Sequence, residues 1–189
     1  MTSDQPTPPA STPASPAPSP LAGLVRELEQ HVAEQGWDQP PRLFALVRTD
    51  ELLSREPHLA QLLGVQDELG PAAGYTSLEQ EELPSYATLE DLLAGIIWPP
   101  EVAGAALVAE RVMLPPDAEE GLPDDEQEAL AVLQSHPARE DIRLAVAVLR
   151  DGSRYCALRM RSHDDPIEVV TGPDLTPSLP EQLLATLEP

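Results

Sequence analysis

Arginine is the residue type in this sequence whose spacing points most directly to binding chemistry. Six of the eleven arginines fall within residues 139–161 beside only three acidic residues, so this segment carries +3 in a chain of net charge −22. Guanidinium groups bind carboxylates and phosphates through paired hydrogen bonds. The candidate interaction patch consists of Arg143, Arg159 and Arg161, with Tyr155 as an amphipathic anchor beside them.

Two interpretations of this patch are open. Arg143 and Arg159 are expected to face each other on neighbouring strands, and directly opposed like charges are unfavourable. An acidic group must therefore lie close to them. It could come from this chain, from Glu110 or the acidic segment 117–128. It could instead be an anionic ligand or an acidic segment of a partner.

The residues needed for several kinds of catalysis are absent. The chain has no lysine, which excludes a Walker A phosphate loop, a Schiff-base enzyme and a pyridoxal phosphate anchor. Neither a G-x-S-x-G nucleophile elbow nor a G-x-G-x-x-G fingerprint occurs. The single cysteine, Cys156, is expected in the core. We predict no catalytic residue and no cofactor, and the sequence favours a non-enzymatic protein.

Two segments approach a metal-ligand pattern without completing it. His163-Asp164-Asp165 are consecutive, and three consecutive side chains do not converge easily on one ion. The segment 117–128 has the outer acidic positions of a calcium loop, but Leu122 stands where the turn needs glycine. We therefore expect solvated loops and predict no metal site.

The arginine patch is expected on a β-hairpin. Residues 142–149 and 153–161 are apolar runs separated by Asp151-Gly152, which is a strong turn signal. A two-residue loop would mix core and polar residues on one face. A three-residue loop at 150–152, with Gly152 in the left-handed conformation, makes one face uniformly apolar and is the predicted register. Its pairs are Val146–Cys156, Leu144–Leu158, Ile142–Met160 and, on the opposite face, Arg143–Arg159.

The remaining elements predict a single α+β domain over residues 20–189. Capping residues and helical apolar spacing predict the helices, and short apolar runs predict the strands. Helices are expected at 20–35, 49–64 with an interruption at Pro57, 89–96, 124–135 and 178–187, and further strands at 42–48, 102–114 and 166–171. This order predicts a mainly antiparallel sheet of four to five strands with helices packed on one face. Residues 1–19 are Pro/Ser/Thr/Ala-rich and are expected to be a disordered tail.

The net charge and the composition limit the classes of partner that this protein is expected to bind. A net charge of −22 and only six aromatic residues disfavour nucleic acid. No apolar run approaches the roughly 20 residues that a membrane span needs, and no targeting signal is visible. We therefore expect a cytoplasmic protein with a protein partner, no nucleic acid and no membrane insertion. The oligomeric state is left open.

Two stretches carry a resemblance to a known family. They are residues 97–111, IWPPEVAGAALVAER, and residues 139–161 together with the downstream Thr171-Gly-Pro-Asp174. The chain resembles a family of small, acidic, uncharacterised actinobacterial proteins over about residues 21–189. The absence of lysine and asparagine, whose codons begin with two adenines, fits a GC-rich genome. The resemblance implies no activity, cofactor or catalytic residue.

These observations predict a non-enzymatic protein-interaction or accessory protein. The prediction depends on the missing catalytic motifs, the acidic balance and the small α+β frame. The alternative is a small-molecule-binding protein or enzyme that acts on an anionic ligand at the arginine-rich sheet face. A deep pocket lined by Arg143, Arg159 and Arg161 would favour the alternative, whereas an exposed apolar groove would favour an interaction protein.

Overall fold

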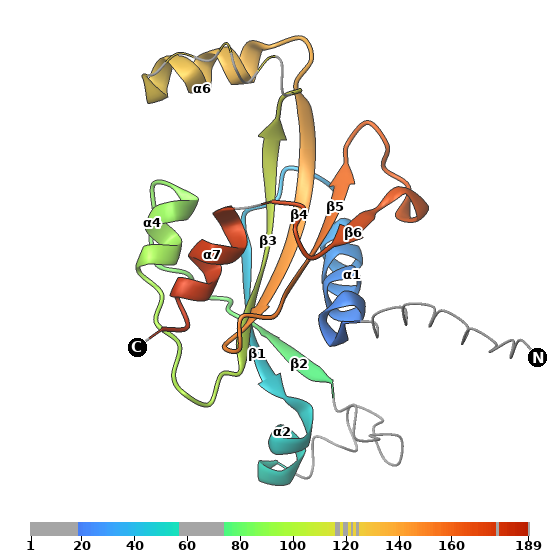
Figure 1. Ribbon diagram of the computed structural model, residues 1–189, viewed down its shortest axis with the longest axis vertical. Coiled ribbons are helices and arrows are strands. Elements are labelled where there is room, and N and C mark those ends of the chain that lie inside the picture. The colour runs from blue at the N-terminus through green and yellow to red at the C-terminus, as the bar shows by residue number, and fades with distance from the viewer. Residues whose placement is uncertain are drawn as a thin grey trace, which may run out of the picture.

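The computed structural model describes residues 19–56, 74–115, 118, 121, 123, 125–176 and 178–188, and its fold is α+β. One antiparallel sheet has six strands in the order β2-β1-β3-β4-β5-β6 (Figure 1). The strands are β1 (Arg42–Arg48), β2 (Tyr75–Glu79), β3 (Gly104–Met113), β4 (Glu140–Leu149), β5 (Arg154–Met160) and β6 (Val170–Gly172). The prediction of four to five strands is therefore too low.

The additional strand is β2, which pairs with β1 at one edge of the sheet. The sequence predicts no strand there because Gly70-Pro71 and Gly74 are turn signals close to its start. The strand is only five residues long, and none of its residues is fully buried. A short edge strand lacks the strong apolar pattern that identifies a central strand.

Helices cover both faces of the sheet (Figure 1). The helix α1 (Pro20–Ala33) packs on one face, and α4 (Leu89–Ala94) and α7 (Ser178–Ala185) lie on the other. Two further helices, α2 (Thr49–Arg55) and α6 (Glu126–Ser135), lie at strand ends, and the short 3₁₀ helix η1 (Pro166–Glu168) precedes β6. The prediction that helices pack on one face is wrong.

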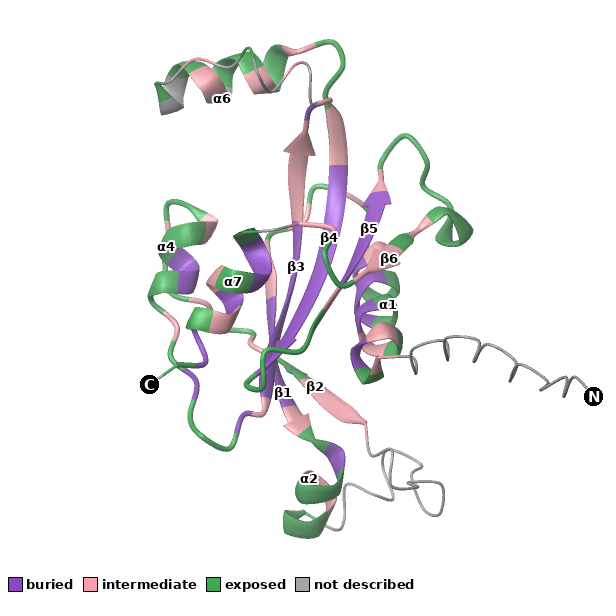
Figure 2. Cartoon of the chain, in the orientation of Figure 1, coloured by how far each residue is buried: buried purple, intermediate pink, exposed green. Residues whose placement is uncertain are grey.

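The cause lies in the central strands, which are apolar on both faces. On β3 and β4, alternate residues such as Leu107 and Val146 enter the core beneath α7, while Val108 and Ala145 enter the core beneath α1. A sheet whose two faces are both apolar must be covered twice. Figure 2 shows burial along the middle of these strands and its decrease towards their outer ends, next to α6.

The predicted hairpin register is confirmed. Ile142 pairs with Met160, Leu144 with Leu158 and Val146 with Cys156, and Arg143 stands opposite Arg159. Gly152 has φ +85°, which is the left-handed conformation that the loop requires. Register follows the apolar face because a slip by one residue would turn every side chain to the opposite face.

The helix α1 packs on the sheet face that carries the arginine patch. Ser19 caps it by accepting a hydrogen bond from the backbone N–H of Leu21, and Pro20 suits the first turn because its missing N–H would be unpaired there. The helix ends at Ala33, two residues before the predicted boundary. Gly36, at φ +83°, then turns the chain back towards the sheet.

Some of the other predicted elements are present in the structure, and some lie outside the residues that it describes. The strands expected at 42–48 and 102–114 are present, and Thr88 caps α4 by accepting from the backbone N–H of Asp91. The tail 1–18, the helical turn at 59–63 and much of the acidic segment 117–124 lie outside the described residues. Within the described ranges, no helix has both the length and the apolar character to cross a bilayer.

Candidate functional site

The arginine patch lies on the face of the sheet that α1 covers. Arg143 and Arg159 are 0% and 3% exposed, so neither is available at the surface. Tyr155 is half-buried against the same core layer, whereas Arg161 is exposed. Arg143 and Arg159 are therefore out of reach of a partner at the surface, because α1 and the loop after it pack over them.

A single carboxylate from α1 lies between the two buried arginines. Glu29, which is 1% exposed, accepts two hydrogen bonds from Arg159, at 2.6 and 2.7 Å. Its Oε1 is also 3.8 Å from Nη1 of Arg143. Desolvation of these charges is costly, and only close geometry with further hydrogen bonds offsets it. Glu29 thus fixes how α1 sits on the sheet.

Each buried arginine has a second acidic partner nearer the surface. Arg143 donates to Glu110 over 2.9 Å and to the carbonyl of Gly36. Arg159 donates to Asp164 over 3.1 Å. Glu110 is the neighbour that the intramolecular interpretation named. The opposed guanidinium groups are therefore neutralised by carboxylates of their own chain.

The loop after α1 covers this cluster. The Trp37 ring lies 4.4 Å from Cζ of Arg143, within cation–π range, and its indole N–H donates to Asp164 over 3.0 Å. Asp38 adopts φ +65°, which is uncommon for a residue other than glycine. Its backbone N–H donates to Glu110, and its carboxylate accepts two hydrogen bonds from Arg161.

Hydrogen bonding keeps these groups charged. The indole of Trp37, followed by Arg159, lowers the pKa of Asp164. The hydrogen bonds from Arg161 lower the pKa of Asp38. The hydrogen bonds to Glu29 raise the pKa of Arg159. These arginines are therefore already committed to internal carboxylates at neutral pH.

A polar cavity of about 320 Å³ lies beside Arg161, and its arginines are likewise paired. Arg161 faces Asp38 and Asp141, and Arg139 also approaches Asp141 at 3.6 Å. Arg111 pairs with Glu90 at 3.0 Å. The cavity thus presents internally balanced charge, and an incoming anion would have to displace a carboxylate.

The other candidates for chemistry occupy structural positions. Burial raises the pKa of the Cys156 thiol, which keeps it in the less reactive protonated form. Asp164 is held by Trp37 and Arg159, and Asp165 caps η1 by accepting from the backbone N–H of Ile167. Among the described residues, no three His, Cys, Asp or Glu side chains are placed to hold a metal ion.

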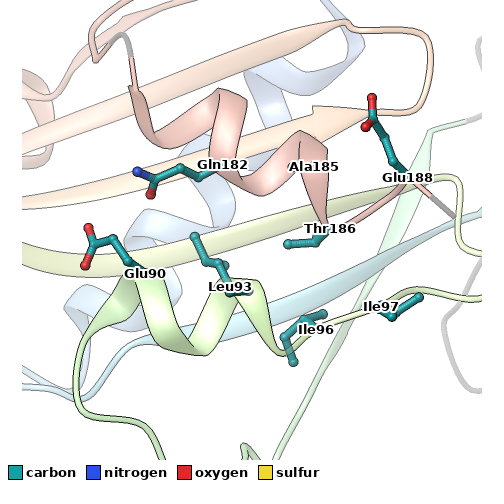
Figure 3. Close-up of a pocket in the computed structure, with 9 residues that line it drawn as sticks. Glu90, Leu93, Ile96, Ile97, Gln182, Ala185, Thr186 and Glu188 are labelled. Atoms are coloured by element: carbon teal, nitrogen blue, oxygen red, sulfur yellow. The ribbon is translucent and has the colours of Figure 1, made fainter.

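An apolar groove of about 460 Å³ lies on the opposite face of the sheet, between α4 and α7. We call it the α4–α7 groove; Figure 3 shows its lining. Ile97 on its rim is 77% exposed. The lining residues are Glu90, Leu93, Ala94, Ile96, Ile97, Gln182, Ala185, Thr186 and Glu188.

Hydrogen bonds hold the two walls of the groove together. The Trp98 indole N–H donates to the hydroxyl of Thr186 over 3.0 Å, and the Trp98 backbone N–H donates to the Thr186 carbonyl. Arg150 donates to the carbonyls of Val102, Pro99 and Trp98 at 2.8 to 3.2 Å, and also to that of Leu187. Ile97 is therefore presented on an anchored loop.

The polar residues of the groove stand towards its ends. Figure 3 shows Glu90 and Gln182 towards one end and Ile97 and Glu188 towards the other. Glu90 is shared with Arg111, and this hydrogen bond lowers the pKa of Glu90. The side-chain oxygen of Gln182 is shielded from solvent and has no hydrogen-bond partner within the described part of the chain.

The buried cluster of Glu29, Arg143 and Arg159 and the α4–α7 groove both lie within a region that matches a known family. The sequence model of the PPA1309-like protein family matches residues 21–188. The chain belongs to this family. The match leaves out the Pro-rich start and includes every residue of the two sites described above. Comparison with curated proteins and with solved structures gives no match.

Proposed function

We propose that this member of the PPA1309-like family is a non-enzymatic accessory protein that binds a protein partner through the α4–α7 groove. The observation that carries the proposal is Ile97, held 77% exposed at the rim of an apolar groove by the anchored loop behind it. An exposed apolar surface rimmed by polar residues is typical of protein-interaction sites. The interaction is expected in the cytoplasm.

The shape and lining of the groove support a protein segment as occupant. Two helices of the same face form its walls, an arrangement that suits a helix or extended segment laid between them. The described part of its lining contains no aromatic ring, and its charged residues, Glu90 and Glu188, stand towards opposite ends rather than converging at one point. Small-molecule sites usually hold a few converging polar groups that fix ligand orientation.

We do not extend the proposal to an anionic small molecule at the arginine face. Arg143 and Arg159 are buried and bound by Glu29, Glu110 and Asp164. A ligand there would have to lift α1 and displace carboxylates that already pair with the guanidinium groups. The actinobacterial origin suggested by the sequence stays a prediction and plays no part in this proposal.

The test compares two isoleucines of similar exposure. Ile97→Glu places a charge on the groove rim, and Ile167→Glu does the same on η1, where Ile167 is 91% exposed. Wild type and both variants are immobilised, and proteins retained from the native cytosol are identified. We expect Ile97→Glu to lose specific proteins that Ile167→Glu retains. Equal retention by all three forms would contradict the proposal.

A further inference from the structure

We infer that the α4–α7 groove receives an amphipathic segment with an apolar centre and a basic residue towards each end. The inference rests on the proposed function and adds the chemistry of the partner. It follows from where the apolar and acidic side chains of the groove lie. The middle and rim are aliphatic, and an acidic residue stands towards each end.

The centre of the groove selects apolar side chains. Leu93 lies in the floor at 3% exposure, and Ile96 is partly buried against the same core. Ile97 extends this aliphatic surface to the rim and is largely exposed. A partner residue seated here would remove apolar surface on both sides from water, which is favourable in proportion to the area.

The ends of the groove select positive charge. Glu188 is exposed, and no ion pair of its carboxylate occurs within the described residues. At the other end, Glu90 is half-exposed and shares only one oxygen with Arg111. The two carboxylates favour a cationic donor over an anion.

The same charges disfavour a second copy of this chain as occupant. Two copies meeting at their grooves would bring their Glu90 and Glu188 side chains together. Each copy also carries a net charge of −22, so their association is opposed at long range as well. A basic segment gains from that field, because opposite charge accelerates encounter and fixes orientation.

The experiment uses three synthetic 15-residue helical peptides with the same leucine positions at i, i+3, i+4 and i+7. Their flanking positions carry lysine, glutamine or glutamate. Binding to the full chain is measured by fluorescence anisotropy at low and physiological salt. We expect the lysine peptide to bind tightest and the glutamate peptide weakest, with the preference for lysine reduced by salt.

Protein variants separate the groove from general charge attraction. Glu188→Gln should weaken the lysine peptide by up to about fivefold, the range of one exposed ion pair, and leave the glutamine peptide unchanged. Glu34→Gln makes the same charge change at the exposed C-cap position directly after α1, on the opposite face. It should leave both peptides unchanged. Ile97→Glu should abolish binding of the glutamine peptide.

The outcomes distinguish the two proposals. If lysine and glutamine peptides bind equally and Ile97→Glu abolishes the binding of both, the groove is a binding site as proposed. The inference that its partner carries basic residues at each end is then wrong. If Glu34→Gln weakens the lysine peptide as much as Glu188→Gln does, the attraction is non-specific and this inference falls. If no peptide binds at millimolar concentration, or Ile97→Glu changes nothing, both this inference and the proposed function are overturned. A dimer in sedimentation that Ile97→Glu dissociates would also overturn the inference.

Discussion

On one face of the sheet, α1 buries Glu29, Arg143 and Arg159 beneath it, while on the other face α4 and α7 leave Ile97 exposed beside an open groove. The side chains with the most obvious binding chemistry are thus interior, and an aliphatic residue is at the surface. A residue type indicates what a group can bind, whereas packing decides whether a partner can reach it.

The two faces also use polar groups differently. Beneath α1, oppositely charged groups pair with one another and connect the helix to strands that are distant in the sequence. Around the α4–α7 groove, neutral carbonyls are gathered by Arg150 and Trp98 at the back, and the acidic groups face outward. The first arrangement gives a specific packing of α1, and the second gives a hydrogen-bonded surface with an acidic residue towards each end.

Substitution of Glu29, which lies between Arg143 and Arg159, is expected to change the stability of the protein most. Glu29→Gln leaves Arg143 and Arg159 buried without their shared carboxylate, which should lower the free energy of unfolding by about 3–5 kcal/mol. Urea unfolding measures the change. Glu34→Gln, at the exposed C-cap of the same helix, is the control and should change the free energy of unfolding by no more than about 0.5 kcal/mol. A loss below about 1 kcal/mol for Glu29→Gln would show that the cluster is not desolvated.

A triple variant tests whether the unpaired buried charges cause this loss of stability. Glu29→Leu, Arg143→Met and Arg159→Leu together replace the buried charges by apolar side chains of similar size. Such replacements are often neutral or stabilising, because the desolvation penalty disappears with the charges. We expect the triple variant to recover most of the stability that Glu29→Gln loses, again by urea unfolding. An additive loss would contradict this explanation.

The second effect tests the support of the groove. Arg150→Met keeps the aliphatic stem but removes the hydrogen bonds to the carbonyls of two loops, which should cost about 2 kcal/mol. The matched control is Arg154→Met, because Arg154 forms an exposed pair with Asp174 that contributes about 0.2–1 kcal/mol. Thermal or urea unfolding separates the two. Equal losses would mean that Arg150 contributes no more than a surface pair.

A smaller effect depends on pH. The pKa of Asp164 is lowered from its ordinary value of 3.8 in the folded protein, chiefly by the Trp37 indole N–H. Its ionised form therefore stabilises the fold above that value, and the contribution is lost as pH falls through the folded pKa. The stability difference between wild type and Asp164→Asn should be constant from about pH 7 to 5 and shrink below about pH 4. A difference that stays flat to about pH 3 would contradict it.

The smallest effect on stability is expected at Ile97. Its side chain is largely exposed, so Ile97→Glu should change the free energy of unfolding by no more than about 0.5 kcal/mol. The same substitution should abolish groove binding. Urea unfolding checks the first statement, and the peptide titration checks the second. A loss of several kcal/mol would mean that Ile97 packs into the core, and would remove it as a surface probe.

The hairpin could be predicted from the sequence because it depends on local information. Its two apolar runs, the glycine at the turn and the alternation of faces together left one register that made a uniform core face. The helix caps at Ser19 and Thr88 were local in the same sense. The covering of both faces was missed, although the unbroken apolar runs of β3 and β4 indicated it.

The partners of the arginines depended on contacts that no local pattern specifies. Glu110 was anticipated because it lies on a strand expected beside the hairpin, and it pairs with Arg143. Glu29 was missed, although it lies four residues after Val25 and three before Val32, on the apolar stripe of α1. A charge on such a stripe signals a buried partner. The groove required α4 and α7 to be side by side, and nothing in either segment alone fixes that.

The bond between Glu29 and Arg159 joins residues 130 positions apart. Contacts of such separation form late, because the chain loses entropy before they can compensate for it. During synthesis, α1 emerges before β4 and β5. Its apolar stripe and the Glu29 carboxylate therefore have no sheet to pack against until those strands are made. The interval between the exit of α1 from the ribosome and the completion of the sheet therefore sets how long the chain is exposed to chaperones and proteases.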